Sequence, residues 1–247
     1  MIRIRGLSKK LGTKQVLDGL DLDIPTGCTI VIMGRSGSGK SVLLKHIIGL
    51  MQPDAGTIEA DGNLMTGLPE PELNELRTRF GMLFQGAALF DSLSVGENIA
   101  LPLREHTQLS AAEIRARVAE RLAWVGLTGV EDMKPSSLSG GMRKRVGLAR
   151  AIAMDPAYIL YDEPTTGLDP IMSDVINRLI RSLQARIGVT SIVVTHDLHS
   201  AWHVGDRLAL LHNGKMVFTG TPSEAKETPD ERVRQFIEGR SDEVIQA

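Results

Sequence analysis

The chain reads Gly34-Arg35-Ser36-Gly37-Ser38-Gly39-Lys40-Ser41 directly after a short apolar run, Thr29 to Met33. This octapeptide fits the pattern G-x-x-x-x-G-K-S/T, whose backbone cradles nucleotide phosphates. A continuous apolar run of this length is typical of a strand that is buried on both faces. The residues from Lys40 to Leu50 have the character of a helix. Because the motif lies between a strand and a helix, this context predicts a phosphate-binding loop.

The octapeptide suits an anionic nucleotide. Its three glycines let the backbone approach phosphate oxygens, and the N-terminus of the following helix directs N–H groups and its dipole at the same atoms. Lys40 is expected to reach the β- and γ-phosphates, and the Ser41 hydroxyl to bind Mg²⁺. A glycine-rich turn beside an exposed lysine is the alternative for this segment alone. The predicted nucleotide contacts are Gly34, Arg35, Ser36, Gly37, Ser38, Gly39, Lys40 and Ser41.

Two carboxylates end a second apolar run. Tyr158 to Tyr161 reads as a buried strand, and Asp162 and Glu163 follow it directly. Adjacent carboxylates at such a place are costly without a cation or strong donors. Asp162 therefore fits the residue that holds Mg²⁺, directly or through water, in phosphoryl-transfer enzymes. Successive residues of a strand point to opposite sides, so Glu163 is expected to face another direction. A solvated strand end is the alternative interpretation.

Three more segments stand in a fixed order around this strand. Gln85 follows the apolar run Phe80 to Phe84, and His196 follows a buried run that ends at Thr195. Between them, Ser139 is a good helix N-cap, and two glycines after it leave the helix N-terminus open to an anion. Each segment is uninformative alone, since a capped helix explains Ser139 equally well.

Together and in this order, the five segments resemble the nucleotide-binding subunit of an ABC transporter, over nearly the whole chain. The resemblance implies an α/β fold: a P-loop NTPase (RecA-like) core with an N-terminal antiparallel β subdomain and an inserted α-helical subdomain. We expect a single ABC ATP-binding domain over residues 1–247, with the helical subdomain at 86–154 and a C-terminal tail at 228–247.

The resemblance also implies roles for single residues in ATP hydrolysis. Glu163 would be the general base, His196 would contact the γ-phosphate, and Gln85 would contact Mg²⁺ and water and link the site to a membrane subunit. The implied catalytic residues are thus Glu163, His196 and Gln85. The implied metal ligands are Ser41, Gln85 and Asp162.

A second set of residues would act on the opposite subunit. In ABC ATPases Ser139, Gly140 and Gly141 cover the γ-phosphate that the other subunit binds, and Asp169 shapes the opposite site. The resemblance therefore implies a head-to-tail homodimer with ATP at its interface.

The sequence departs from the family at two positions. Met142 stands where the family usually has glutamine, but Ser139 and both glycines remain, so we expect the contact in trans to survive. Leu11 stands where the family has an aromatic residue that stacks on adenine, and no Phe, Tyr or Trp precedes Phe80. We therefore expect weak base stacking and weak discrimination of ATP from GTP.

Other stretches narrow the resemblance. The segments Gly81 to Phe90, Leu101 to Thr107 and Pro229 to Phe236 look like those of the ATPase of Mla/Mce-type lipid transporters of Gram-negative bacteria. This implies that ATP hydrolysis drives phospholipid traffic between inner and outer membranes. The implied partners are integral membrane permease subunits and accessory lipid-binding subunits. The alternatives are an ABC ATPase for another small substrate, such as an amino acid or a drug, or a non-transport ABC ATPase. Leu89, Phe90 and Leu93 are predicted to be exposed and to contact the permease, and for each of them a place in the core of the helical subdomain is the alternative.

Composition agrees with an ordinary globular protein. Of the 247 residues 42% are hydrophobic, and no apolar run approaches the roughly 20 residues of a membrane helix. The N-terminus alternates like a strand and lacks the apolar stretch of a signal peptide. The net charge is -2, so no nucleic-acid partner is expected. The single Cys28 suits a reducing compartment. We expect a peripheral protein on the cytoplasmic side of the inner membrane.

Local patterns predict several further elements. Leu20, Leu22 and Ile24 alternate with polar residues, as in a half-buried strand. Asn213-Gly214 indicates a two-residue hairpin between strands 207–211 and 215–219. Ser110 and Glu113 form a capping-box pattern before a helical stripe. A strand is predicted over 189–195, and Val233, Phe236 and Ile237 would be the apolar side of a short helix.

Overall fold

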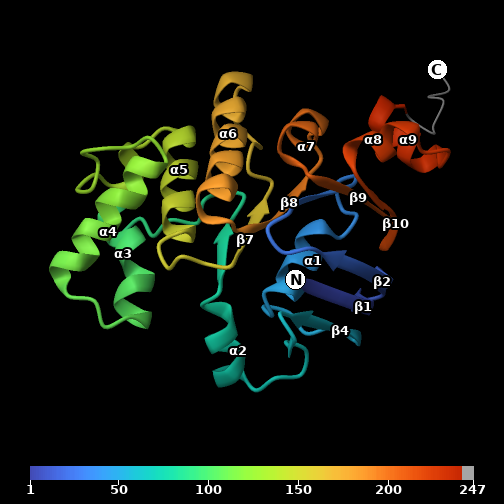
Figure 1. The fold of residues 1–247 in the computed structure, drawn as a ribbon, viewed down its shortest axis with the longest axis horizontal. Coiled ribbons are helices and arrows are strands. Elements are labelled where there is room, and N and C mark those ends of the chain that lie inside the picture. Colours follow the sequence, from blue (N-terminus) through green and yellow to red (C-terminus); the bar gives the residue numbers. More distant parts are fainter. Residues whose placement is uncertain (241–247) are drawn as a thin grey trace. The chain divides into compact units, whose positions relative to one another are not determined.

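The structure is a computed structural model and describes residues 1–240. The chain divides into two compact units. Unit 1 consists of Met1–Gly67 and the segment that begins at Val194, and unit 2 is Leu68–Val193. Figure 1 shows the two units by the colour of the ribbon, blue and red for unit 1 and green to orange for unit 2.

Unit 1 contains the predicted antiparallel sheet, with strand order β2-β1-β4-β5. Its register pairs Ile2 with Ile24 on one side and with Ala60 on the other. Leu20, Leu22 and Ile24 are buried, which confirms the alternation read from the sequence. The strands are β1 (Ile2–Leu11), β2 (Lys14–Ile24), β4 (Ala55–Ala60) and β5 (Asn63–Leu64).

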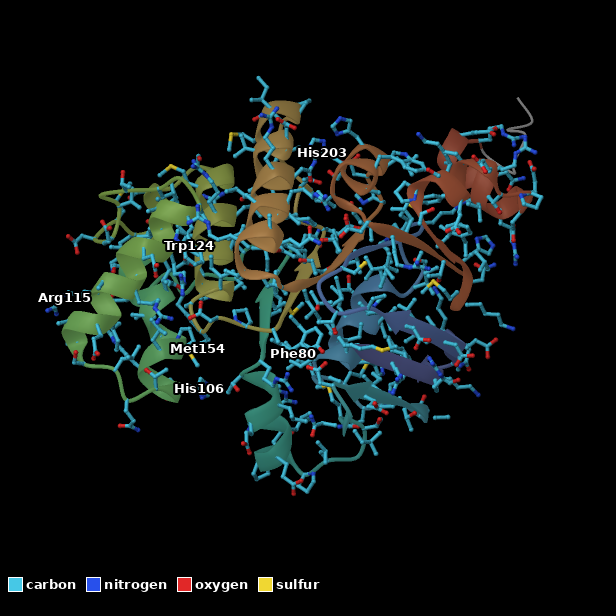
Figure 2. The ribbon with its side chains drawn as sticks, viewed as in Figure 1. Phe80, His106, Arg115, Trp124, Met154 and His203 are labelled. Atoms are coloured by element: carbon cyan, nitrogen blue, oxygen red, sulfur yellow. The ribbon has the colours of Figure 1, made fainter. Side chains whose placement is uncertain are left out.

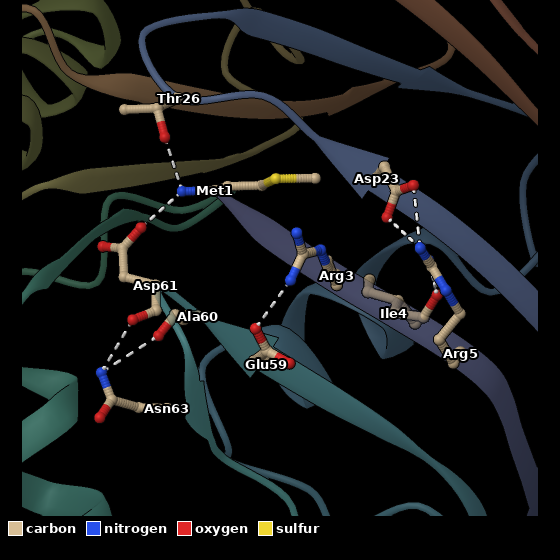
Figure 3. Close-up of polar contacts among 10 residues, drawn as sticks. All are labelled: Met1, Arg3, Ile4, Arg5, Asp23, Thr26, Glu59, Ala60, Asp61 and Asn63. Carbon is tan, nitrogen blue, oxygen red and sulfur yellow. Dashed lines mark hydrogen bonds and ion pairs between the residues drawn. The ribbon is translucent and has the colours of Figure 1, made fainter.

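Charged side chains line the exposed face of this sheet (Figure 3). Arg3 of β1 pairs with Glu59 of β4 at 3.2 Å, and Arg5 pairs with Asp23 of β2 at 2.7 Å. Exposed pairs of this kind contribute about 0–1 kcal/mol each. They therefore favour the observed register more than they add to stability.

The second sheet has the strand order β10-β9-β3-β8-β7-β6. Strand β3 runs parallel to β9, and β6 runs parallel to β7. Every residue of β3 and of β8 is buried, as the continuous apolar runs predict. The strands are β3 (Thr29–Met33), β6 (Phe80–Leu83), β7 (Tyr158–Asp162), β8 (Thr190–Thr195), β9 (Arg207–His212) and β10 (Lys215–Gly220).

The hairpin between β9 and β10 has the predicted turn. Asn213 and Gly214 have φ angles of 48° and 77°, as a two-residue hairpin turn requires. Gly214 O accepts a hydrogen bond from Asp18 N at 2.9 Å. A Cβ on Gly214 would lie 2.8 Å from Val16 O, so this turn packs tightly against β2.

Within residues 1–240, four helices belong to unit 1. Helix α1 ends at Ile47, three residues before the predicted end, because Gly49 is left-handed at φ 72° and the chain turns away. In the C-terminal helix Val233 is buried, while Phe236 and Ile237 are half-buried. Residues 241–247 of the predicted tail lie outside the described residues. The helices are α1 (Lys40–Ile47), α7 (Leu198–Val204), α8 (Pro222–Glu227) and α9 (Glu231–Glu238).

Unit 2 is mostly helical. Helices α3, α4 and α5 lie side by side (Figure 1), and all three fall within residues 86–154. The capping box of Ser110 with Glu113 is present, and Ser94 forms a second one with Glu97. The helices are α2 (Glu70–Arg77), α3 (Val95–His106), α4 (Ala111–Trp124), the 3-10 turn η1 (Pro135–Ser137), α5 (Gly140–Ala151) and α6 (Pro170–Ile187).

Trp124, at the end of α4 and labelled in Figure 2, contacts two arginine side chains. The guanidinium groups of Arg121 and Arg186 lie 4.0 and 4.9 Å from the centre of its ring. Arg186 belongs to α6, so this cation–π contact joins α4 to α6. Across residues 1–240, none of the helices combines the length and the apolar character that crossing a membrane requires.

Candidate active site

The phosphate loop, Gly34–Ser41, follows β3 in unit 1. A Cβ on Gly34 would lie 2.5 Å from Leu211 O and 2.6 Å from Ser38 Oγ. Gly39 has φ 105°, and a Cβ there would lie 2.9 Å from Val16 O. Larger residues are therefore excluded at both positions. The close packing of Gly34 and Gly39 fixes the path of the loop between β3 and α1.

Lys40 closes over this loop. Its side chain is buried, and its Nζ donates to Gly34 O at 2.8 Å and to Arg35 O at 3.2 Å. No side chain caps the start of α1, and the first turn has no acidic residue. The positive end of the α1 dipole therefore meets no carboxylate from its own first turn, an arrangement that suits a bound anion.

One polar atom inside the loop lacks a partner. Ser38 Oγ is buried and has no hydrogen-bond partner among the described residues. A buried hydroxyl without a partner costs about 1–3 kcal/mol. A phosphate oxygen would accept its hydrogen bond, so this orphaned donor fits a nucleotide. Arg35, Ser36 and Gly37 are exposed, and Ser41 is half-buried at the start of α1.

His196 and Leu11 also belong to unit 1. His196 is exposed directly after β8, where Asp197 begins α7 by accepting from His199 N at 2.9 Å. Leu11 is 44% exposed at the end of β1 and pairs with Lys14 across the turn. The Leu11 side chain is thus accessible to a ligand.

In unit 2 the strand β7 ends at Asp162, and Glu163 follows it directly outside the strand. Glu163 is 8% exposed and has φ 49°, a left-handed conformation that costs a non-glycine residue about 1–2 kcal/mol. The Thr166 hydroxyl donates to Glu163 Oε2 at 3.2 Å. Strain of this kind clusters at functional sites.

A buried lysine lies close to the two carboxylates and binds the main chain of Glu163. Lys144 Nζ donates to Glu163 O at 3.2 Å. Burial lowers the pKa of Lys144, while the charges of Asp162 and Glu163 act to raise it. The sequence did not reveal this residue. It lies within the run Arg143-Lys144-Arg145, and nothing in the run marks which side chain turns inward.

Ser139 and Asp169 both begin helices. Ser139 Oγ accepts from Met142 N at 3.2 Å, which confirms the predicted N-cap of α5. Asp169 Oδ1 accepts from Met172 N at 2.9 Å and caps α6. A Cβ on Gly141 would lie 2.5 Å from Met172 Cε, so the starts of the two helices are in close contact. Gly140 is exposed.

Gln85 is exposed in the turn that follows β6. The next residues are Gly86, Ala87 and Ala88, and both alanines have positive φ, 63° and 49°. The predicted residues therefore divide between the units. Unit 1 carries the phosphate loop and His196, and unit 2 carries the remainder, Gln85, Ser139, Gly140, Gly141, Asp162, Glu163 and Asp169.

Comparison with known sequences agrees with these features. Residues 17–166 match the protein family described as ABC transporter. The chain is 46% identical over 240 residues to the "Probable ribonucleotide transport ATP-binding protein mkl" of Mycobacterium leprae, covering 97% of this chain and 69% of that protein. It is 43% identical over 242 residues to the "Intermembrane phospholipid transport system ATP-binding protein MlaF" of Haemophilus influenzae, covering 98% and 92%.

Solved structures have the same fold. A dimeric ATP-binding cassette in a post-hydrolysis state, bound to ADP and Pi, superposes with a TM-score of 0.83 at 34% identity. The superposition covers 90% of this chain and 98% of that one. The predicted P-loop NTPase fold, with its N-terminal antiparallel sheet, is thus confirmed.

Proposed function

The chain belongs to the ABC transporter family and is an ATPase, and from this premise we propose that its ATP hydrolysis drives phospholipid transport between the inner and outer membranes. The observation that carries the proposal is the similarity to the phospholipid-transport protein MlaF along nearly the full length of both chains. The segments first associated with lipid transporters lie within this similarity. The protein would act as a peripheral subunit on the cytoplasmic face of the inner membrane.

The phosphate loop would bind the ATP phosphates. The orphaned Ser38 hydroxyl and the backbone N–H groups at the start of α1 would donate to phosphate oxygens. Lys40 would exchange the carbonyls of Gly34 and Arg35 for the β- and γ-phosphates.

The oxygens of Ser41, Gln85 and Asp162 would hold Mg²⁺, since hydroxyl, amide and carboxylate oxygens are ligands that this hard cation accepts. When bound, Mg²⁺ neutralises charge on the β- and γ-phosphates. Glu163 would orient the attacking water and accept its proton. Lys144 donates to the backbone oxygen of Glu163 and would hold its main chain in place. His196 would contact the γ-phosphate.

Assembly as a head-to-tail homodimer would complete the site. Ser139 and Gly140 are exposed at the start of α5, whose first turn has no acidic residue. The exposed N-terminus of α5 suits the γ-phosphate bound by a second copy. Gly141, the next residue of the helix, is buried. Asp169 is exposed at the start of α6, and the side chain of Met172 in the same helix packs against Gly141. The dimeric state of the similar solved cassette supports this arrangement.

Phe90 is the residue that we propose for docking to the permease. Its side chain is 53% exposed, whereas Leu89 and Leu93 are half-buried, so the prediction that all three are exposed was wrong. The wholly buried Asn98 holds the Phe90 backbone, accepting from its N at 2.8 Å and donating to its O at 3.1 Å. An exposed aromatic ring on a fixed loop is a typical binding hot spot.

Another cargo is the second candidate. The similar mycobacterial protein is named for ribonucleotide transport, so the alternative is an ABC ATPase for another small substrate such as a ribonucleotide. The inserted helical subdomain at 86–154 and the C-terminal tail at 228–247 remain predictions from the sequence. The accessory lipid-binding subunits follow from the resemblance to lipid transporters.

Co-purification and reconstitution test the proposal. The chain would be isolated with its membrane partners from detergent-solubilised membranes, and the bound lipids would be identified. The complex would then be placed in vesicles that contain a fluorescent phospholipid. We expect ATP-dependent movement of the phospholipid, and none of a labelled ribonucleotide. ATP hydrolysis without phospholipid movement would refute the cargo and leave the ATPase assignment intact.

A further inference from the structure

The segment Gln85–Ala88, called here the glutamine loop, has an unusual backbone. Ala87 and Ala88 are consecutive and both have left-handed φ angles, 63° and 49°. Alanine pays a steric cost in this region that glycine avoids. Such a conformation persists when surrounding groups hold it in place. Part of the structure must therefore hold the glutamine loop.

Arg150, near the end of α5, makes the holding contacts. Its Nη1 donates to Ala88 O at 2.7 Å, and its Nη2 donates to Ala87 O at 2.9 Å. One planar guanidinium thus binds the carbonyls of both strained residues. Two bonds from a rigid fork fix orientation as well as distance.

Close packing joins the same helix to the strand before the loop. A Cβ on Gly147 of α5 would lie 2.9 Å from Leu83 Cδ1 and 3.2 Å from Ala87 Cβ. A Cβ on Gly81 of β6 would lie 2.1 Å from Ala151 O. Helix α5 therefore packs against the segment from Gly81 to Ala88 with no room for a larger side chain at either glycine. Arg150 adds hydrogen bonds between the two.

We propose that Arg150 is a positioning residue that holds Ala87 and Ala88 in their left-handed conformation and thereby sets the place of Gln85. Ser139, Gly140 and Gly141 begin the same helix. Arg150 would therefore couple a movement of the glutamine loop to a movement of the start of α5. Arg150 itself touches no nucleotide in this proposal. The inference rests on the proposed function, in which Gln85 contributes to ATP hydrolysis.

The test removes the guanidinium and then removes the strain. Arg150→Ala should lower the kcat of ATP hydrolysis in the assembled transporter about tenfold to a hundredfold, since small misplacements have effects of this size. The affinity for ATP should change little because the phosphate loop is untouched. Adding Ala88→Gly should recover most of the lost rate, since glycine adopts the left-handed conformation unaided. Ala88 is exposed, so losing its methyl group opens no cavity.

Arg145 supplies a matched control on the same helix. Its Nη1 donates to Gly126 O at 3.0 Å, away from the glutamine loop. Arg145→Ala should lower the thermal stability without lowering kcat. Adding Ala88→Gly to this control variant should leave its kcat unchanged. Arg150→Lys, with a single point charge, should give an intermediate kcat.

Two results would overturn the proposal. One is an Arg150→Ala variant with the kcat of the wild type. The other is a kcat loss that Ala88→Gly leaves unrepaired, which would make Arg150 a general packing residue. ATP hydrolysis is the readout throughout, so failure to move phospholipid would count against the cargo and not against Arg150.

Discussion

Lys144 Nζ lies 3.2 Å from the backbone oxygen of Glu163, and both residues are buried. A buried ammonium needs compensation, and here it finds a carbonyl and two nearby carboxylates. The contact also holds the main chain of Glu163 at its positive φ. A single lysine thus binds the main chain of the proposed general base and lies near both carboxylates.

Replacing this lysine should affect stability and turnover together. Lys144→Met keeps the volume but removes the donor, and hydrogen bonds from charged groups contribute about 1.5–3 kcal/mol. We expect a lower melting temperature and a lower kcat for ATP hydrolysis, with ATP binding nearly unchanged. Calorimetry and steady-state hydrolysis measure the two effects. Lys45→Met on exposed α1 surface is the control, and wild-type values for Lys144→Met would remove the lysine from this role.

Glu163→Gln should bind ATP and hydrolyse it far more slowly. The amide cannot accept the proton of water, and loss of a general base typically lowers the rate by ~10²–10⁴. The variant should accumulate as a dimer with ATP at the interface, which size-exclusion chromatography with scattering detects. Normal turnover in the assembled transporter would mean that another group is the base.

Leu11→Tyr should tighten nucleotide binding. The side chain at this position is 44% exposed, and stacking of an aromatic ring on a base contributes about 1–3 kcal/mol in nucleic-acid complexes. Titrations with ATP and with GTP, both against the wild type, give the affinity change. If neither nucleotide responds, the base lies elsewhere.

Phe90→Asp should weaken permease binding and leave ATP binding by the isolated chain nearly intact. A charge on an exposed ring position disrupts an apolar contact without disturbing the buried Asn98 behind it. Loss of lipid traffic should also make the outer membrane sensitive to detergent. Leu50→Asp is the matched control, since Leu50 is exposed to the same 53%. Joint loss of permease and ATP binding would identify Phe90 as part of the core, and no loss would place docking on another surface.

His46 predicts a pH dependence of folding stability. Burial lowers its pKa below the ordinary 6.5, an effect that Lys9 reinforces and Asp54 opposes. The unfolded chain therefore binds a proton at this site more readily than the folded chain does. The free energy of unfolding is highest above pH 6.5 and falls as the pH drops below that value. Urea unfolding at several pH values between 7.5 and 5 should show this slope. His46→Gln should flatten it, and an unchanged slope would assign it to other groups.

Sequence patterns predicted those elements whose conformation is set by residues close together in the chain. The phosphate loop, the Asn213-Gly214 turn and the caps at Ser110 and Ser139 all depend on neighbours within a few residues, and each is present. Lys144 and Arg150 were missed because their partners lie 19 and 62–63 residues away. No spacing rule encodes such contacts.

The sequence also did not predict which individual apolar residues are exposed. Leu89 and Leu93 flank Phe90 and are equally apolar, yet the two leucines are half-buried. Asn98 of α3 fixes the backbone of this loop, since it accepts from Phe90 N and donates to both Phe90 O and Leu93 O. That bond pattern depends on how α3 packs, which the sequence of the loop does not state.

The turn at Gly214 matters for protein engineering. A surface hairpin tip is usually where a fluorescent domain or an epitope can be inserted without harm. Here the Val16 carbonyl that the turn packs against is also the one that excludes a side chain at Gly39. A graft at Asn213-Gly214 would push on that shared carbonyl and reach the phosphate loop. A reporter domain is therefore better attached elsewhere than at the loop that looks most permissive.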